Sequence, residues 1–236
     1  MCIRDRVIDA LRGVRVVAIA AGFFHSMVLT DEGVVLSFGA ELCGHLGHGD
    51  GAGYCEPKVI EALSGVRVAA IAAGDLHSLV LTDKGAVLSF GSGEGLGHGD
   101  EHDGDAEDQY VPKVIEALRD THVVAIAAGS RHSMVLTDKG EVLSFGNGRY
   151  GQLGHDDQAA QREPTPMLAL HGTRVVAIAV GGWQSMVLTD EGKVLSFGDG
   201  RLGQIGHGDR EDQLMPKVIE EPVSYTHLTL PTILLV

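Results

Sequence analysis

Residues 14–39 read VRVVAIAAGFFHSMVLTDEGVVLSFG, and close copies of this unit begin at Val66, Thr121 and Thr173. A glycine that ends the first apolar run recurs in every copy, with spacings of 52, 55 and 52 residues, as Gly22, Gly74, Gly129 and Gly181. The longer spacing has a local cause, because the second copy loses two residues in GSGEGLG and gains five in DEHDGDAEDQYVP. Loops tolerate such insertions, so the sequence predicts a repeat protein whose elements keep their phase.

Each copy contains four short apolar runs separated by turn residues, and in the first copy these are Val16–Ala21, Ser26–Thr30, Val34–Phe38 and Lys58–Leu63. Leu36 and Phe38 alternate with Ser37, as expected for a strand with two unequal faces. Four strands in a unit of about fifty residues are typical of one β-propeller blade. The alanine-rich first run suits the crowded position nearest the propeller axis.

A helical or leucine-rich solenoid is the alternative for a period near fifty residues. The segment PKVIEAL, residues 57–63, could form a helical turn because Glu, Ala and Leu favour helix. The other three runs are rich in β-branched residues and are bounded by turns, which favours strands. The propeller is therefore the preferred prediction.

A three-residue turn, Asp-Glu-Gly or Asp-Lys-Gly, separates the second and third runs and ends at Gly33, Gly85, Gly140 and Gly192. A hairpin loop of this length needs a left-handed residue at its last position, which glycine adopts without a Cβ clash. We expect these four glycines to be structural turn residues.

The composition indicates a folded chain, with 44% hydrophobic residues and 33 glycines. A formal charge of −14 disfavours direct binding to nucleic acid, which depends on cationic side chains. Cys2, Cys43 and Cys55 do not recur from copy to copy, so no disulfide framework is predicted. Without a membrane-length apolar run or a signal peptide, we expect an intracellular protein, cytoplasmic or nuclear, with no membrane partner.

The two end segments, residues 1–6 and 222–236, look foreign to the repeats. Residues 1–5 can be encoded by a DNA string whose reverse complement encodes residues 223–227. That string resembles the transposon adapter used in sequencing libraries. We predict that both segments derive from an adapter, so the apolar tail TLPTILLV is not interpreted as a membrane anchor.

The repeated string AAGxxHSMVLTDxGxVLSFG resembles the repeat of the regulator of chromosome condensation family. The hallmarks of that family here are Gly22 with His25, Phe38 with Gly39, and the Gly-Gln-Leu-Gly of residues 151–154. Departures are visible, since Gln184 replaces the histidine, His45 replaces the glutamine, and Phe stands where the family often has Trp.

The resemblance covers residues 7 to about 221. It implies repeats at about 14–65, 66–120, 121–172 and 173–221, with residues 7–13 as the tail of a preceding repeat. Family rings usually have seven blades. The implied fold is therefore an all-β propeller of four-stranded blades, with four blades present as an open arc of a seven-bladed ring.

Several histidine and acidic motifs resemble metal or catalytic sites, but their positions do not favour either function. The Gly-His-Gly-Asp tetrads at His48, His98 and His207, with a variant at His155, resemble metal ligands, but one per blade cannot converge. His25, His77 and His132 each precede a serine, yet adjacent strand residues point to opposite faces, so no catalytic dyad is predicted. The acidic segment of residues 100–108 lacks the calcium-loop spacing. We expect no catalytic residue, metal, cofactor or small-molecule substrate.

Residues that differ between the copies are the better candidates for function, because recurring residues build the blade. The dipeptide before His-Ser and the loop after Phe-Gly both vary. Aromatic and arginine side chains in loops are the usual anchors of protein interfaces, so we predict partner-binding roles for Phe24, Arg131, Tyr150 and Trp183. The alternative is that these side chains only cover neighbouring blades.

The predicted function is a protein-interaction scaffold whose partner is another protein. The near-identical repeats resemble the propellers of the large HECT-type ubiquitin ligases, in which catalysis would lie outside this chain. The alternative is a guanine-nucleotide exchange factor for a Ran-like small GTPase, the activity for which the family is named. That activity depends on an inserted wedge hairpin, whereas the insertion here is a short acidic loop. One tryptophan cannot form the chromophore of the plant ultraviolet photoreceptor of this family.

Overall fold

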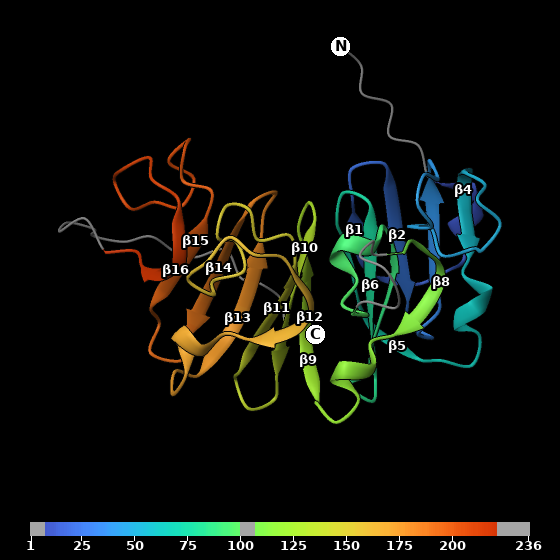
Figure 1. Cartoon of the computed structure of the whole chain (residues 1–236). Coiled ribbons are helices and arrows are strands. Elements are labelled where there is room, and N and C mark those ends of the chain that lie inside the picture. Colours follow the sequence, from blue (N-terminus) through green and yellow to red (C-terminus); the bar gives the residue numbers. More distant parts are fainter. Residues whose placement is uncertain (1–7, 100–106, 221–236) are drawn as a thin grey trace, which may run out of the picture.

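The computed structural model describes residues 8–99 and 107–220, and within them the chain folds into four antiparallel sheets of four strands each (Figure 1). Each sheet is one blade, and its strands lie side by side in chain order. The predicted all-β fold of four-stranded blades is confirmed. The end segments 1–6 and 222–236, Cys2 and most of the acidic segment lie outside the described residues.

The strand bounds repeat from blade to blade. Blade 1 contains β1 (Val16–Ala21), β2 (His25–Thr30), β3 (Val35–Gly39) and β4 (Tyr54–Val59), and blade 2 contains β5 (Val68–Ala73), β6 (His77–Thr82), β7 (Val87–Gly91) and β8 (Gln109–Val114). Blade 3 contains β9 (Val123–Ala128), β10 (His132–Thr137), β11 (Val142–Gly146) and β12 (Gln161–Pro166), and blade 4 contains β13 (Val175–Val180), β14 (Gln184–Thr189), β15 (Val194–Gly198) and β16 (Gln213–Val218).

The fourth strand differs from the prediction, which placed it at Lys58–Leu63. It runs instead over Tyr54–Val59, and Glu61–Leu63 forms the short 3-10 helix η2. The strand starts early because Gly39 of β3 pairs with Tyr54 across an irregularity in the ladder. The Glu-Ala-Leu triplet then turns the chain toward the next blade, in keeping with its helical propensity.

Hairpin turns join the second and third strands of each blade. Gly33 has a φ of 82°, and its equivalents in the other blades have φ of 81°, 81° and 79°, at Gly85, Gly140 and Gly192. In blade 1 the Gly33 amide donates to the Thr30 carbonyl at 3.0 Å, and the Thr30 hydroxyl accepts from the Val34 amide at 3.1 Å. The left-handed glycine and the threonine together close each loop.

The hydrophobic core lies between consecutive blades. Met27 and Leu29 of blade 1 pack with Val80 and Phe90 of blade 2, and η2 adds Leu63 to the same cluster. Equivalent clusters fill the other two interfaces of the described arc. The alanine-rich inner strands β1, β5, β9 and β13 contact one another in sequence, as predicted for the crowded axis.

Hydrogen bonds between histidine and serine also cross each of these interfaces. The Nε2 atom of His25 lies 2.8 Å from Ser78 Oγ of blade 2, and the equivalent distances are 2.9 Å for His77 with Ser133 and 2.9 Å for His132 with Ser185. Ser78 donates its own hydrogen to the His45 carbonyl at 2.9 Å. His25 must therefore donate through Nε2, because a serine hydroxyl carries one hydrogen.

Within the described residues, the outer face of blade 1 and the outer face of blade 4 are each without a neighbouring blade. Ile19 of β1 is 79% exposed, whereas its equivalents Ile71, Ile126 and Ile178 pack into the interblade cores. Met186 of β14 is half-buried, whereas its equivalent Met134 is fully buried. These differences fit an arc that is open at both ends. Across residues 8–99 and 107–220, no helix has the length and apolar character to span a bilayer.

Candidate binding face

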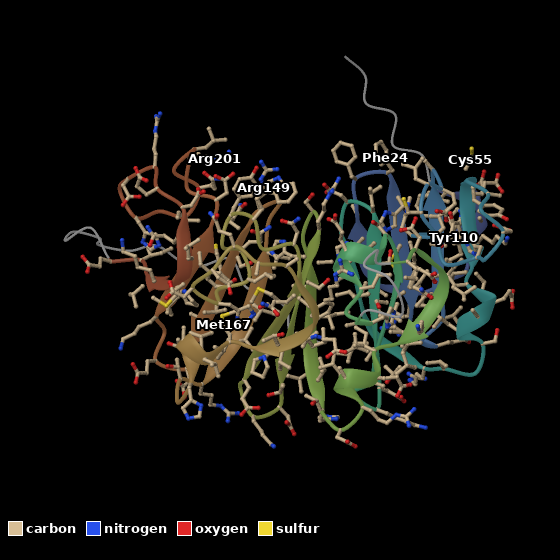
Figure 2. All side chains as sticks on the ribbon, in the orientation of Figure 1. Phe24, Cys55, Tyr110, Arg149, Met167 and Arg201 are labelled. Atoms are coloured by element: carbon tan, nitrogen blue, oxygen red, sulfur yellow. The ribbon has the colours of Figure 1, made fainter. Side chains whose placement is uncertain are left out.

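Two kinds of loop gather at one rim of the arc, because each blade is an up-and-down meander. These are the loops between the first and second strands and between the third and fourth strands. The hairpins that end at Gly33 and its equivalents lie at the opposite rim. Figure 2 shows Phe24, Arg149 and Arg201 along the upper rim of the view, well above Met167. All four residues predicted to bind a partner belong to loops of this upper rim.

Tyr150 and Trp183 are brought together from two blades. Tyr150 lies in the β11–β12 loop of blade 3 and Trp183 in the β13–β14 loop of blade 4. Their ring centroids are 5.5 Å apart at an interplanar angle of 75°, an edge-to-face contact. Both side chains stay partly exposed, so the pair presents an aromatic surface at the rim.

Arg131 and Phe24 lie apart from that pair. Arg131 reaches back to blade 2, where its guanidinium is 3.3 Å from Glu94 Oε2, and both side chains are about half-exposed. Phe24 is in blade 1 and packs edge-on against Phe23 at 4.5 Å, with 46% and 68% of the two residues exposed. The four predicted residues therefore do not form a single cluster within the described arc.

The loop that carries Tyr150 is held rigidly from below. The fully buried Gln152 accepts a hydrogen bond from the Tyr150 amide at 2.9 Å, and its side-chain amide bonds Asn147 Oδ1 at 3.3 Å. Asn147 Oδ1 also accepts from the Arg149 amide at 3.0 Å. Gly151 adopts a φ of 79°, which allows the chain to turn under the tyrosine. The Gly-Gln-Leu-Gly motif thus supports the exposed Arg149–Tyr150 dipeptide.

Arg201 is a further component of the aromatic surface. Asp199 binds it through two hydrogen bonds, at 2.8 Å to Nε and 2.9 Å to Nη2. The guanidinium carbon lies 4.3 Å from the Tyr150 ring centroid, within the range of a cation–π contact. The hydrogen bonds from Arg201 lower the pKa of the Asp199 carboxyl, so this ion pair persists at neutral pH.

Sequence reasoning noted the loops that hold Arg149, Arg201 and Leu202 but did not select these residues. The guanidinium of Arg149 is 5.7 Å from the same tyrosine ring, and Leu202 is 87% exposed. A signal was present, because Arg149 and Arg201 occupy the same position of two successive loops. Equivalent loop positions in two successive repeats are neighbours in space.

The tetrad histidines each bond a serine in the third strand of their own blade. The Nε2–Oγ distances are 2.9 to 3.0 Å for the pairs His48–Ser37, His98–Ser89, His155–Ser144 and His207–Ser196. Ser37 in turn donates to the Leu46 carbonyl at 2.6 Å, so His48 is the donor to Ser37. Within the part of the chain that the structure describes, no cluster of three His, Cys, Asp or Glu side chains is arranged to hold a metal.

The chain is similar to known proteins both in sequence and in fold. The chain matches the family model of the RCC1-like domain over residues 3–230. It is 38% identical to the human E3 ubiquitin-protein ligase HERC2 over 220 residues, which are 92% of this chain and 4% of that protein.

Two solved structures have similar folds. Human WBSCR16 aligns with a TM-score of 0.78 and 27% identity, over 88% of this chain and 53% of that one. Yeast RCC1 (Prp20), solved with Kap60 bound, aligns with a TM-score of 0.73 and 25% identity, over 91% of this chain and 51% of that one. The chain therefore spans about half the length of these structures and a small part of HERC2.

Proposed function

The chain belongs to the RCC1-like domain family, and from that premise we propose that it is a protein-interaction scaffold whose partner docks on the upper rim. The observation that carries the proposal is the contact of Tyr150, Trp183 and Arg201, three anchor-type side chains supplied by loops of two blades. Interface energy is concentrated in such aromatic and arginine side chains. Hydrogen bonds of Gln152 to the Tyr150 loop and of Asp199 to Arg201 hold these side chains in place before binding, which reduces the entropy lost on binding.

The relatives support this function at the level of the domain. HERC2 is named as a ubiquitin ligase, and the chain corresponds to 4% of its length. In a larger protein of that HECT-type class, this chain would select a partner and another domain would carry out catalysis. Yeast RCC1 was solved with a bound protein, Kap60, so a protein that contains this type of domain has a protein partner.

The first test is partner capture by surface variants of the whole chain. Truncating Trp183 to alanine, or reversing the charge with Arg131→Glu, is expected to weaken partner capture at least about tenfold. The free energy of unfolding should fall by no more than ~1 kcal/mol, because both side chains are partly exposed. Urea titration followed by circular dichroism measures the second quantity.

A matched control is Leu168→Ala, which removes an apolar side chain that is 80% exposed on the opposite rim. This variant should capture the partner as the unmodified chain does. A collapse of the fold in Trp183→Ala or Arg131→Glu would instead assign a structural role to those residues. Equal loss of capture in Leu168→Ala would move the binding face to the other rim.

Nucleotide exchange on a Ran-like GTPase is the second candidate, favoured by the structural similarity to yeast RCC1. Within residues 8–99 and 107–220 every strand belongs to one of the four blades, so no additional wedge hairpin is present there, and the acidic insertion lies mostly outside the described residues. We therefore predict no acceleration of nucleotide release. Release of a fluorescent guanine nucleotide from the GTPase, with and without the chain, measures this, and a dose-dependent increase in rate would contradict the scaffold proposal.

A further inference from the structure

The upper rim carries a compact surface that we name the arginine–aromatic ledge, formed by Arg149, Tyr150, Trp183, Arg201 and Leu202. Tyr150 lies at its centre, with Trp183 against its edge and two guanidinium groups within 6 Å of its ring. Leu202, at 87% exposure, adds an apolar side chain from the loop that holds Arg201. Cationic and apolar groups thus meet on one small, preformed surface.

The two arginines of the ledge differ in how their charge is balanced. Arg201 is neutralised by Asp199, to which its guanidinium donates two hydrogen bonds, and it lies over the Tyr150 ring. Arg149 has no acidic partner among the described residues, and its side-chain contact is the longer one to the Tyr150 ring. One guanidinium therefore remains able to bind a carboxylate through its planar pair of donors.

The charge of the ledge contrasts with that of the whole chain, which is −14. Arg201 faces Asp199, and Asp212 lies beside that carboxylate and accepts from the Gly200 amide at 3.0 Å, so the positive charge left without an acidic partner among the described residues is that of Arg149. At physiological ionic strength the Debye length is about 8 Å, so groups in direct contact outweigh the acidic remainder of the molecule. Charge complementarity at the Arg149 guanidinium consequently favours an anionic group there.

From this geometry we infer that the ledge binds an acidic segment of a partner protein. A carboxylate of the segment pairs with Arg149, and a neighbouring apolar side chain packs on Trp183 and Leu202. The inference rests on the proposed scaffold function and adds to it the chemistry of the partner. An uncharged apolar segment would leave the Arg149 guanidinium partly desolvated without a hydrogen-bond acceptor, which is unfavourable.

Trp183 makes the inference directly measurable, because it is the one tryptophan of the sequence. Its fluorescence reports occupation of the ledge by peptides that contain no tryptophan. The probes are the capped peptides EEFEE, QQFQQ and KKFKK, titrated into the full chain in about 0.15 M NaCl, where the Debye length is about 8 Å. We expect EEFEE to give a saturable change with an affinity at least about tenfold higher than that of QQFQQ, as for a charge-assisted pair.

Variants of Arg149 separate charge from shape. Arg149→Gln should reduce the affinity for EEFEE about tenfold and leave that for QQFQQ unchanged, and Arg149→Lys should recover part of the loss. Arg119→Gln is the matched control, because Arg119 is an exposed arginine paired with Glu116 after η4 (Glu116–Leu118), beside the opposite rim. It should bind EEFEE as the unmodified chain does.

Three results would overturn the inference: equal affinities for EEFEE and QQFQQ, tighter binding of KKFKK, or unchanged EEFEE binding in Arg149→Gln. Failure here is distinguishable from failure of the scaffold proposal. If Trp183→Ala still loses its protein partner while EEFEE does not bind, the rim binds protein by another chemistry. If Trp183→Ala retains the partner, the binding face itself is wrong.

Discussion

Replacing Gly129 with alanine is expected to lower the free energy of unfolding by about 4 kcal/mol, a large effect for the addition of one methyl group. A Cβ atom at this position would lie closer than 3.0 Å to the carbonyl oxygen of Gly181 in the next blade and to the ring of His132. Neither can move freely, because His132 is fully buried and bonds Ser185 at 2.9 Å. The methyl group must therefore separate the two blades or break that hydrogen bond.

Gly182→Ala is the matched control for this substitution. Gly182 lies in the β13–β14 loop of the next blade, which is equivalent to the loop that holds Gly129. A Cβ atom on Gly182 would meet no atom within 4 Å. Its unfolding free energy should stay within ~1 kcal/mol of that of the unmodified chain. Urea titrations of both variants, followed by circular dichroism, give the two values. A loss in Gly129→Ala no larger than that in Gly182→Ala would mean that the blades are less tightly apposed than the structure shows.

The same contact explains the spacing of the Gly-x-x-His motif. Gly22 and Gly74 face the carbonyl oxygen of the equivalent glycine in the next blade and the ring of the histidine three residues later. The glycine leaves space for the ring, and the ring reaches the serine of the next blade. Glycine, histidine and serine therefore act together in joining one blade to the next.

Sequence reasoning predicted the blade because its signals are local. The strand around Ser37 and the turn ending at Gly33 depend on residues within one hairpin, and both are found in the structure. The prediction that this strand has two unequal faces was wrong, because Ser37 is as fully buried as Leu36 where β3 lies inside the blade. The bounds of β4 were wrong, because Tyr54–Val59 contains a proline and its start is set by pairing with Gly39 rather than by alternation. Nothing in the strand's own sequence shows where that pairing begins.

The partners of the histidines could not be predicted for a different reason. The sequence places His77 beside Ser78, yet His77 bonds Ser133 of blade 3 while Ser78 accepts from His25 of blade 1. That contact depends on how blades stack, which a single repeat does not encode. The candidate site could not be predicted for the same reason, because the contact of Tyr150 with Trp183 joins two blades. Phe24 takes no part in that contact.

The interblade histidines also determine how stability responds to acid. Burial lowers the pKa of His25 to about 3, that of His77 to about 4 and that of His132 to about 3. Each donates through Nε2 to a serine, and the Nδ1 atoms of His25 and His132 have no hydrogen-bond partner among the described residues. The folded chain therefore holds these three side chains neutral under conditions in which the unfolded chain protonates them.

Lowering the pH from 7.5 to 5 is expected to destabilise the chain by several kcal/mol. Above the unfolded pKa of about 6.5, neither state binds a proton at these histidines, and their neutral form imposes no penalty. Below pH 6.5 these histidines become protonated in the unfolded chain but stay neutral in the folded chain. The free energy of unfolding therefore falls with pH until the pH reaches the folded pKa values of 3 to 4. At pH 5 the loss is about 2 kcal/mol for each histidine.

The sequence itself suggests the variant that tests this origin, because Gln184 stands in blade 4 where the other blades have histidine. Glutamine can donate a hydrogen bond through its amide but does not titrate. His132→Gln should therefore reduce the loss of stability between pH 7.5 and pH 5 by about 2 kcal/mol, whatever its effect at pH 7.5. Urea titrations of both chains at several pH values across this window provide the comparison. Carboxyl groups titrate mainly below it, with unperturbed pKa values of about 4. An equal pH dependence in the two chains would show that the acid sensitivity arises elsewhere than at the blade interfaces.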